Sequence, residues 1–418
     1  MRLTPAVIQH AEEVLREVLR FNGPADMTLS RYFREHPKLG PRERSAVAEG
    51  VYGLLRNKSV YLNFSESGVG PAMRRLALLG LADAVGADAL GGLSEQETQW
   101  LNHVMQIDRT TLPVLTRANL PKWLFDKLVA QEGEAGMLTL ADSLNRPAPL
   151  DLRVNAIKST REQVMTALAV APIPSEPTPY SPLGIRLKKK PTLQNLTLFQ
   201  EGAIEVQDEG SQLLTQIVGA KRGEMVVDFC AGAGGKTLAL GAAMRNTGRL
   251  YAFDVSDKRL AQLKPRLARS GLSNVHPAVI AHENDTKIKR LAGKIDRVLV
   301  DAPCSGLGTL RRNPDMKWRQ TPETVAEMNA KQAAILQGAS RLVRPGGRLV
   351  YGTCSILNEE NEAIVEGFLA ANPQFALKPM HEVLAEQKID LAMQDYLKLS
   401  PERHQTDGFF AAVFERQP

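Results

Sequence analysis

The stretch that decides the fold is MVVDFCAGAGGKT, residues 225–237. An apolar run typical of a buried strand passes into a turn of small residues and then into a helical pattern. Small side chains let the backbone approach a ligand closely, and the first turn of a helix offers unpaired N–H groups with a partial positive charge. The stretch therefore predicts a strand, a ligand-binding turn and a helix within an α/β fold.

The end of this turn also invites comparison with a nucleotide phosphate loop, because Gly235, Lys236 and Thr237 fit the close of that motif. The phosphate loop requires a glycine five residues before its last glycine, and Cys230 occupies that position. An ATPase is therefore disfavoured. Glycines that merely close a tight connection between strand and helix remain the alternative.

Downstream of Gly202 the pattern of strands and helices alternates regularly. This alternation predicts a parallel, doubly wound sheet, in which ligands bind at the carboxyl ends of the strands. The expected strands are Met225–Phe229, Leu250–Phe253, Val275–Val279, Arg297–Val300 and Leu349–Tyr351, and the expected helices are 236–244, 258–270, 322–342 and 359–371.

Upstream, two further regions are expected. Residues 1–140 carry apolar positions at helical spacing and predict an all-helical domain. Residues 141–200 predict a small α/β module, with strands at 150–155 and 185–188 and a helix at 160–169. Residues 201–418 then form the α/β domain.

Composition limits the function classes. The 418 residues suffice for two or three cores, and the net charge of +6 favours a polyanionic partner without establishing one. Three cysteines are too few for a disulfide scaffold, and the chain carries neither a basic-then-apolar leader nor an 18-residue apolar run. We expect a cytoplasmic protein that binds no membrane, with a monomer as the default state.

Acidic residues follow two of the predicted strands. Asp254 ends the second strand, where a carboxylate can accept hydrogen bonds from a ribose diol. Helix capping is the alternative, although Ser256 and Asp257 are better placed for it. Asp285 follows the third strand and either receives an adenine amino group or is simply solvated.

Two thiols follow neighbouring strands. The fourth strand leads into DAPCSG, residues 301–306, and the fifth leads into Thr353, Cys354 and Ser355. A lone cysteine is usually an inert buried residue, but two at adjacent strand ends favour chemistry. Because no further cysteine or histidine completes a zinc spacing, we expect no metal, and nucleophilic catalysis is left.

A basic segment follows the first of these thiols. Its charged side chains and one aromatic ring suit phosphate contact combined with base stacking, whereas a solvated charged face is the alternative. The candidate RNA-binding residues are Arg311, Arg312, Lys317, Trp318 and Arg319.

Taken in order, these motifs resemble the Nol/Nop/Sun family of RNA cytosine-5 methyltransferases. The resemblance covers roughly residues 145–418, and the amino-terminal region is more weakly similar to the RNA-binding fold of an antitermination factor. It implies a Rossmann-like class I methyltransferase domain, a small RRM-like α+β module and an all-α amino-terminal recruitment domain. The motifs that carry it are residues 228–237, 301–306, RRNPD at 311–315, YGTCSILNEENE at 351–362 and DGFF at 407–410.

The resemblance also implies a cofactor, S-adenosylmethionine. Its methionine portion would lie in the turn after the first strand, with Lys236 pairing with its carboxylate. Gly232 and Ala233 depart from the family's usual alanine and proline, which loosens this turn. The implied cofactor-binding residues are Cys230, Ala231, Gly232, Ala233, Gly234, Gly235, Lys236, Asp254, Asp285 and Asp301.

Finally, the resemblance implies the chemistry. Cys354 would attack carbon 6 of a cytosine, Cys304 would assist release of the enzyme, and Asp301 would hold the base, the cofactor or both. The target cytosine should be unpaired or flipped out. Small-subunit ribosomal RNA is the expected substrate; a transfer RNA substrate, or an RNA-binding assembly factor with vestigial activity, are the alternatives.

Overall fold

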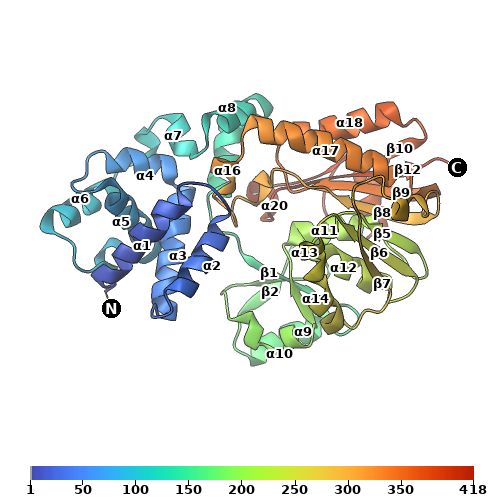
Figure 1. Cartoon of the computed structure of the whole chain (residues 1–418), viewed down its shortest axis with the longest axis horizontal. Helices are drawn as coiled ribbons and strands as arrows, with labels where there is room; N and C mark the ends of the chain where they lie inside the picture. The colour runs from blue at the N-terminus through green and yellow to red at the C-terminus, as the bar shows by residue number, and fades with distance from the viewer. Residues whose placement is uncertain (1) are drawn as a thin grey trace. The chain divides into compact units, whose positions relative to one another are not determined.

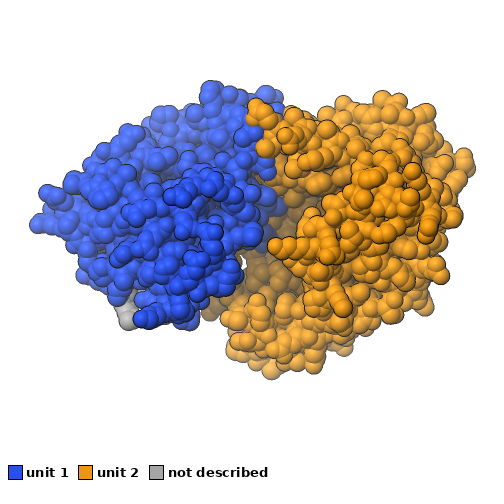
Figure 2. Space-filling view, in the orientation of Figure 1, with its two compact units in different colours: residues 1–147, 309–322 blue, residues 148–308, 323–418 orange. Residues whose placement is uncertain are grey.

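The computed structural model describes residues 2–418, which form two compact units. Unit 1 comprises residues 1–147 together with 309–322, and unit 2 comprises residues 148–308 and 323–418 (Figure 2). The chain therefore leaves unit 2 after Gly308, contributes fourteen residues to unit 1, and returns at Glu323. This excursion differs from the sequential division at residues 140 and 200 that the sequence suggests.

Unit 1 is helical, as expected for residues 1–140. Local signals define its helices: Ser94 caps one of them by accepting a hydrogen bond from the Glu97 amide at 3.1 Å, while Glu97 binds back to the Ser94 amide at 2.8 Å. The helices are α1 Pro5–Val18, α2 Ala25–Glu35, α3 Pro41–Arg56, α4 Lys58–Ser65, α5 Ala72–Val85, α6 Glu95–Met105, α7 Val114–Ala118, α8 Lys122–Leu144 and the short α16 Met316–Arg319.

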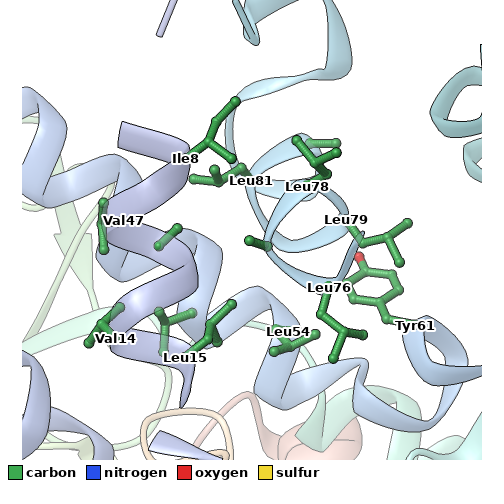
Figure 3. Close-up of a cluster of buried hydrophobic side chains, with 14 of the residues drawn as sticks. Ile8, Val14, Leu15, Val47, Leu54, Tyr61, Leu76, Leu78, Leu79 and Leu81 are labelled. Carbon is green, nitrogen blue, oxygen red and sulfur yellow. The ribbon is translucent and has the colours of Figure 1, made fainter. Parts of the chain in front are cut away.

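The core of unit 1 lies between α1, α3, α4 and α5. Apolar side chains from these helices point toward one another (Figure 3). Ile8, Leu54 and Leu79 are completely buried, in keeping with the helical spacing of their sequence. Burial of each such side chain stabilises the fold by roughly 2 kcal/mol, so the helical unit has a hydrophobic core of its own.

A small antiparallel sheet begins unit 2. Its strand order is β2-β3-β1-β4, with β1 Leu150–Val154, β2 Ser175–Pro177, β3 Gly184–Leu187 and β4 Ile204–Val206. Helix α9, Arg161–Val170, packs against it through the buried Val164 and Leu168. The sheet confirms the predicted small α+β module and adds β2 and β4, which lie in proline-rich or short segments without a strand pattern.

The main sheet of unit 2 has the order β10-β12-β9-β8-β5-β6-β7, with β11 paired to β12. Its five parallel strands confirm the predicted alternation, and its class is the predicted Rossmann-like one. They are β5 Met225–Asp228, β6 Arg249–Asp254, β7 Val275–Val279, β8 Ile295–Asp301 and β9 Val343–Thr353.

The sheet is mixed rather than wholly parallel, because β12 Phe409–Arg416 runs antiparallel beside β9. Strands β10 Phe375–Lys378 and β11 Leu397–Leu399 pair with β12, also antiparallel. The sequence prediction ended at residue 371 and missed these strands. Their pairing partners are distant in sequence, and no local pattern reveals such pairing.

Helices cover both faces of this sheet (Figure 1). One face packs against α11 Glu209–Val218 and α12 Gly235–Ala243, the other against α17 Pro322–Ser340 and α18 Glu362–Ala371. Alternate residues of β8 serve the two faces, Leu299 the first and Val298 the second. The remaining helices of unit 2 are α10 Thr197–Gln200, α13 Asp257–Ala261, α14 Leu263–Ser270, α15 Thr286–Lys289, α19 Met380–Glu386 and α20 Pro401–His404.

This arrangement fixes the position of the strand ends. Strand β5 pairs in parallel with both β6 and β8, so the sheet reverses its winding direction at β5. The carboxyl ends of β5, β6, β8 and β9 therefore share one edge. None of the helices in residues 2–418 combines the length and the apolar character that a bilayer span requires.

Candidate active site

The two thiols meet at the carboxyl edge of the main sheet. Strands β8 and β9 are parallel neighbours with Asp301 opposite Gly352, and Cys304 and Cys354 lie in the turns that follow. Their sulfur atoms are 3.4 Å apart. The prediction that these cysteines converge is confirmed, because parallel pairing brings both turns to one edge.

The two sulfurs do not have equivalent surroundings. The hydrogen bond with Cys354, together with burial, raises the pKa of the Cys304 thiol well above its ordinary value. Cys304 is therefore held as a neutral thiol that can donate a hydrogen bond to Cys354. A division of roles between the two sulfurs is consistent with this asymmetry.

A lysine and an aspartate lie beside the thiols. The Lys236 ammonium, from the first turn of α12, binds the Asp301 carboxylate at 2.7 Å and lies 5.7 Å from the centre of the Phe409 ring. Burial opposes the charge on Lys236, but Asp301 and the Cys354 thiolate raise the pKa of the ammonium. The Coulombic interaction between Lys236 and Cys354 puts this cation within electrostatic reach of the sulfur.

Backbone contacts fix both thiol-bearing turns. The Gly308 amide donates to the Cys354 carbonyl at 2.8 Å, and the Gly408 amide donates to the Gly308 carbonyl at 2.8 Å. A Cβ atom on Gly308 would lie 2.2 Å from the Gly408 oxygen, so only glycine permits this approach. The DGFF motif at residues 407–410 therefore meets the catalytic turn through backbone.

The turn between β5 and α12 has the form expected of a ligand-binding loop. Gly232 and Gly234 have φ values of +54° and +85°, which favour glycine. The Ala231 and Gly232 amides are bonded to the Phe253 carbonyl and to Asp254, respectively. Within residues 2–418 the amides of Ala233, Gly235 and Lys236 have no hydrogen-bond partner, so they can bind an anionic or polar group.

Two arginines that the sequence reading missed hold the outer side of this turn. Arg266 of α14 donates to the Ala233 carbonyl at 2.7 Å, and Arg153 of β1 donates to the Gly235 carbonyl at 2.7 Å. Arg266 is itself paired with Glu205 of β4 at 2.9 Å. These contacts hold two carbonyl oxygens of the turn in place. No local pattern marks Arg153 or Arg266, because their partners are distant in sequence.

The predicted cofactor acids differ in their surroundings. Asp254 is buried and accepts from the Gly232 amide and the Ser256 amide, both at 2.8 Å, so it links the turn after β5 to the end of β6. Asp285 caps α15, since its oxygens accept from the Ala281 and Lys287 amides. These backbone hydrogen bonds lower the pKa of Asp285. Contacts of either acid with ribose or adenine stay predictions.

Asp228 ends β5, and no role was predicted for it from the sequence. It is buried and accepts a hydrogen bond from the Thr237 hydroxyl at 2.7 Å. Burial raises the pKa of its carboxyl to about 7. Cys230 lies two residues beyond this acid in the turn, and burial raises the pKa of its thiol well above the ordinary value.

The structure corrects the prediction for the basic segment. Lys317 is completely buried in unit 1, where its ammonium donates to the Arg56 carbonyl at 3.0 Å and to Asn145 at 2.6 Å. The Trp318 indole donates to the Leu55 carbonyl at 2.9 Å and packs against the helical core. Neither side chain is presented to an RNA phosphate or base.

The other members of that segment keep partial exposure. Arg319 is paired with Asp315 at 3.1 Å, and Arg311 donates to the Pro147 carbonyl at 3.4 Å. Arg312 is likewise half-buried. RNA contacts by Arg311, Arg312 and Arg319 stay predictions.

The metal-binding potential of the described residues lies outside the thiol site. Among residues 2–418, the grouping able to ligate an ion is His10, Glu13 and His36, on α1 and at the end of α2. The Tyr32 hydroxyl joins two of these side chains, since it donates to Glu13 at 2.6 Å and bonds to His10 at 2.8 Å. The grouping is accounted for as a polar network between two helices.

Comparison with known proteins adds family evidence. Residues 215–415 match the family described as 16S rRNA methyltransferase RsmB/F, and residues 120–194 match the ferredoxin-like domain of RsmF/B-like methyltransferases. A Synechocystis protein named "Probable ribosomal RNA small subunit methyltransferase B" is 31% identical, over 96% of this chain and 98% of its own length.

Solved structures agree in fold. The crystal structure of PH0851 superposes with a TM-score of 0.78 at 26% identity and covers 100% of both chains. The structure of NSun6 from Pyrococcus horikoshii with SFG has a TM-score of 0.63 at 20% identity, over 71% of this chain and 98% of that one. The first similarity extends over both units of the chain.

Proposed function

The chain belongs to the RsmB/F family of S-adenosylmethionine-dependent RNA (cytosine-5) methyltransferases, and we propose that it methylates a cytosine of 16S ribosomal RNA through a covalent adduct with Cys354. The observation that carries this proposal is the pair of sulfur atoms 3.4 Å apart beside the Lys236–Asp301 ion pair. A single inert cysteine needs neither a second thiol nor a nearby cation.

The residues at the edge of the sheet fit the methyl donor. The unpartnered amides of Ala233, Gly235 and Lys236 suit its carboxylate, and Asp254, the last residue of β6, is the acid that we assign to its ribose. Bound there, S-adenosylmethionine supplies an electrophilic methyl group. The chain's own task is to make carbon 5 of the cytosine nucleophilic enough to accept it.

Cys354 performs the activating step. Its thiolate forms a bond to carbon 6, and the electron pair of the 5,6 double bond moves toward carbon 5 and the polar groups of the ring. Lys236 stabilises the thiolate before attack. Asp301, bound to Lys236 at 2.7 Å, is placed to accept a hydrogen bond from the exocyclic amino group of the base and so hold it in position.

Cys304 acts when the adduct breaks. After methylation the proton on carbon 5 leaves to a base, its electron pair re-forms the 5,6 double bond, and the carbon–sulfur pair returns to Cys354. The neutral Cys304 thiol, 3.4 Å away, donates a hydrogen bond to that sulfur as negative charge returns to it. This role requires a protonated thiol, which its raised pKa provides.

The choice of 16S ribosomal RNA rests on the family description and on the Synechocystis relative, whose match extends over 98% of its length. The +6 net charge suits an RNA partner. Because duplex stacking hides carbon 6, the target should be unpaired or flipped. Transfer RNA remains the second candidate, since the thiol chemistry is the same.

Bisulfite sequencing tests the substrate. RNA from cells with and without the protein is compared, and purified enzyme is then given each RNA class with labelled methyl donor. We expect one cytosine in 16S ribosomal RNA to lose protection when the protein is absent. Loss confined to transfer RNA would support the second candidate, and unchanged protection throughout would overturn the proposal.

Cys304→Ala tests the division of labour between the thiols. Without the Cys304 hydrogen-bond donor, we expect turnover to fall by about a hundredfold while a denaturant-resistant complex of protein and RNA accumulates. Gel electrophoresis in denaturant measures the complex, and Glu366→Gln, an exposed change on α18, serves as the control. An active variant that accumulates no complex would contradict the release role.

A further inference from the structure

Behind the two thiols lies a buried carboxylate that no part of the proposed reaction uses. Glu360 ends a short helical turn after β9 and is completely buried. It accepts hydrogen bonds from the Ser305 amide at 2.8 Å, the Ser305 hydroxyl at 2.5 Å and Gln332 at 3.0 Å. It also accepts from the Ser355 hydroxyl.

Two of these partners, Ser305 and Ser355, connect Glu360 to the cysteines. Ser305 follows Cys304 directly and Ser355 follows Cys354 directly, so one carboxylate is bound to the neighbours of both sulfurs. On the other side of each cysteine, the Ala302 amide donates to the Gly352 carbonyl at 2.8 Å. Each thiol is therefore held between a fixed strand end and a fixed serine.

We propose that Glu360 is a positioning residue that sets the separation of Cys304 and Cys354 by clamping Ser305 and Ser355; its catalytic consequence rests on the proposed function. The residue does not touch substrate. It acts through the two turns, and its effect is the 3.4 Å distance between the sulfurs.

The chemistry of the site calls for a carboxylate in particular. The side-chain oxygens of Glu360 accept from four donors: two hydroxyls, a backbone amide and the Gln332 amide group. An ionised carboxylate is acceptor-only and satisfies all four. Glutamine has the same shape but turns an NH2 group toward these donors, which leaves part of the clamp unmade.

A purely structural role is the competing explanation. Glu360 also accepts the Tyr351 hydroxyl through its carbonyl oxygen at 2.6 Å, and the adjacent Asn361 binds Thr353 at 2.6 Å. Those contacts do not depend on the carboxylate. A structural role predicts lower stability alone, whereas a positioning role predicts that the two thiols stop acting as a pair.

The first experiment measures the thiol pair without RNA or methyl donor. Phenylarsine oxide binds tightly only when two thiols lie close together, so it is titrated against full-length protein carrying Cys230→Ser. We expect Glu360→Gln to weaken capture at least tenfold, while Glu366→Gln, an exposed change on α18, leaves it unchanged. Capture by Glu360→Gln equal to that of the parent would overturn the proposal.

The second experiment measures how the covalent complex partitions. If the sulfurs separate, release slows more than attack, so we expect Glu360→Gln to raise the steady-state fraction of denaturant-resistant complex at least fivefold, in the direction of Cys304→Ala. Should Glu360→Gln fail to fold, Ser355→Ala removes one contact of the clamp and is expected to shift both measurements in the same direction. Unchanged capture and unchanged partition in Ser355→Ala would also overturn the proposal.

Together the two experiments distinguish failure of the Glu360 proposal from failure of the proposed methylation function. Capture that depends on Glu360 in a protein that forms no RNA complex would leave the clamp standing and remove the methylation mechanism. If the parent forms the complex but neither arsenical capture nor partition changes in Glu360→Gln, the methylation mechanism would stand and the clamp would be refuted.

Discussion

Two consecutive segments after β8 carry residues that the sequence analysis predicted to be functional, but they belong to different units of the structure. Residues 302–308 stay in unit 2 and bring Cys304 to Cys354, while residues 309–322 enter unit 1 and bury Lys317 in its core. Both segments follow the same strand of the main sheet, β8. A chemically suggestive side chain becomes a site only where its neighbours leave it open to a ligand.

The buried lysine shows the difference in energetic terms. Burial and the nearby Arg56 lower the pKa of the Lys317 ammonium well below its ordinary value, and oxygens of Arg56 and Asn145 bind it. Lys236 is also shielded, but the Asp301 carboxylate binds its ammonium and raises its pKa. Two lysines of the same chain thus serve stability in one unit and chemistry in the other.

The largest effect that would test this contrast is expected at the thiols. Cys354→Ala removes the nucleophile, and we expect the methylation rate to fall by about four orders of magnitude or more, because the uncatalysed methyl transfer has no route through carbon 6. A radiolabelled methyl-transfer assay measures it, with Glu366→Gln on the exposed side of α18 as control. Activity within tenfold of the parent would refute the nucleophile assignment.

The next effect concerns Lys317. Lys317→Ala leaves the Arg56 carbonyl and Asn145 without their donor and opens a cavity, so we expect a loss of roughly 3 kcal/mol in the free energy of unfolding. RNA binding should show the same dependence on salt as the parent, because no phosphate contact is lost. If the slope of log affinity for RNA against log salt concentration were instead smaller by about one, with unchanged stability, the predicted RNA contact of Lys317 would be supported.

The smallest expected effect concerns Asp228, a buried carboxyl of unit 2, and is seen in how the free energy of unfolding depends on pH. The pKa of Asp228 is raised to about 7, so its stabilising contribution is present at low pH and is lost as pH rises through that value. Relative to Asp228→Asn, the parent should lose roughly 2 kcal/mol between about pH 5 and pH 8. Urea denaturation at both pH values measures this, and parallel curves for the two proteins would contradict the burial effect.

The prediction that the two thiols meet at the ends of neighbouring strands is confirmed because it rests on chain topology. Alternating strands and helices imply a parallel sheet, and a parallel sheet gathers its carboxyl ends at one edge. The convergence of Cys304 and Cys354 was accordingly predicted from their positions in the sequence, whereas the role of Lys236 was implied by the family resemblance and that of Asp301 drew on it. The family match then supplied the reaction class.

What failed had the same physical origin in each case. The antiparallel strands β10 to β12, the excursion of residues 309–322 and the arginines behind the cofactor turn all depend on partners far away in sequence. Composition identified Arg311 to Arg319 as basic but could not say that Lys317 packs against α3 and α8. A charged side chain in isolation carries no information about its burial.

The sequence by itself determined the α/β class, the helical character of the amino-terminal region and the strand ends at which the two thiols lie, because apolar periodicity and turn residues act locally. Only the tertiary structure decided that Ser305, Ser355 and Glu360 converge, that Lys317 is internal, and that the sulfurs lie 3.4 Å apart. The Cys304–Cys354 and Ser305–Glu360 contacts join residues 50 and 55 positions apart, and the contacts of Lys317 with Arg56 and Asn145 span 261 and 172 positions. Such pairings are set by packing over the whole core rather than by any stretch of the chain.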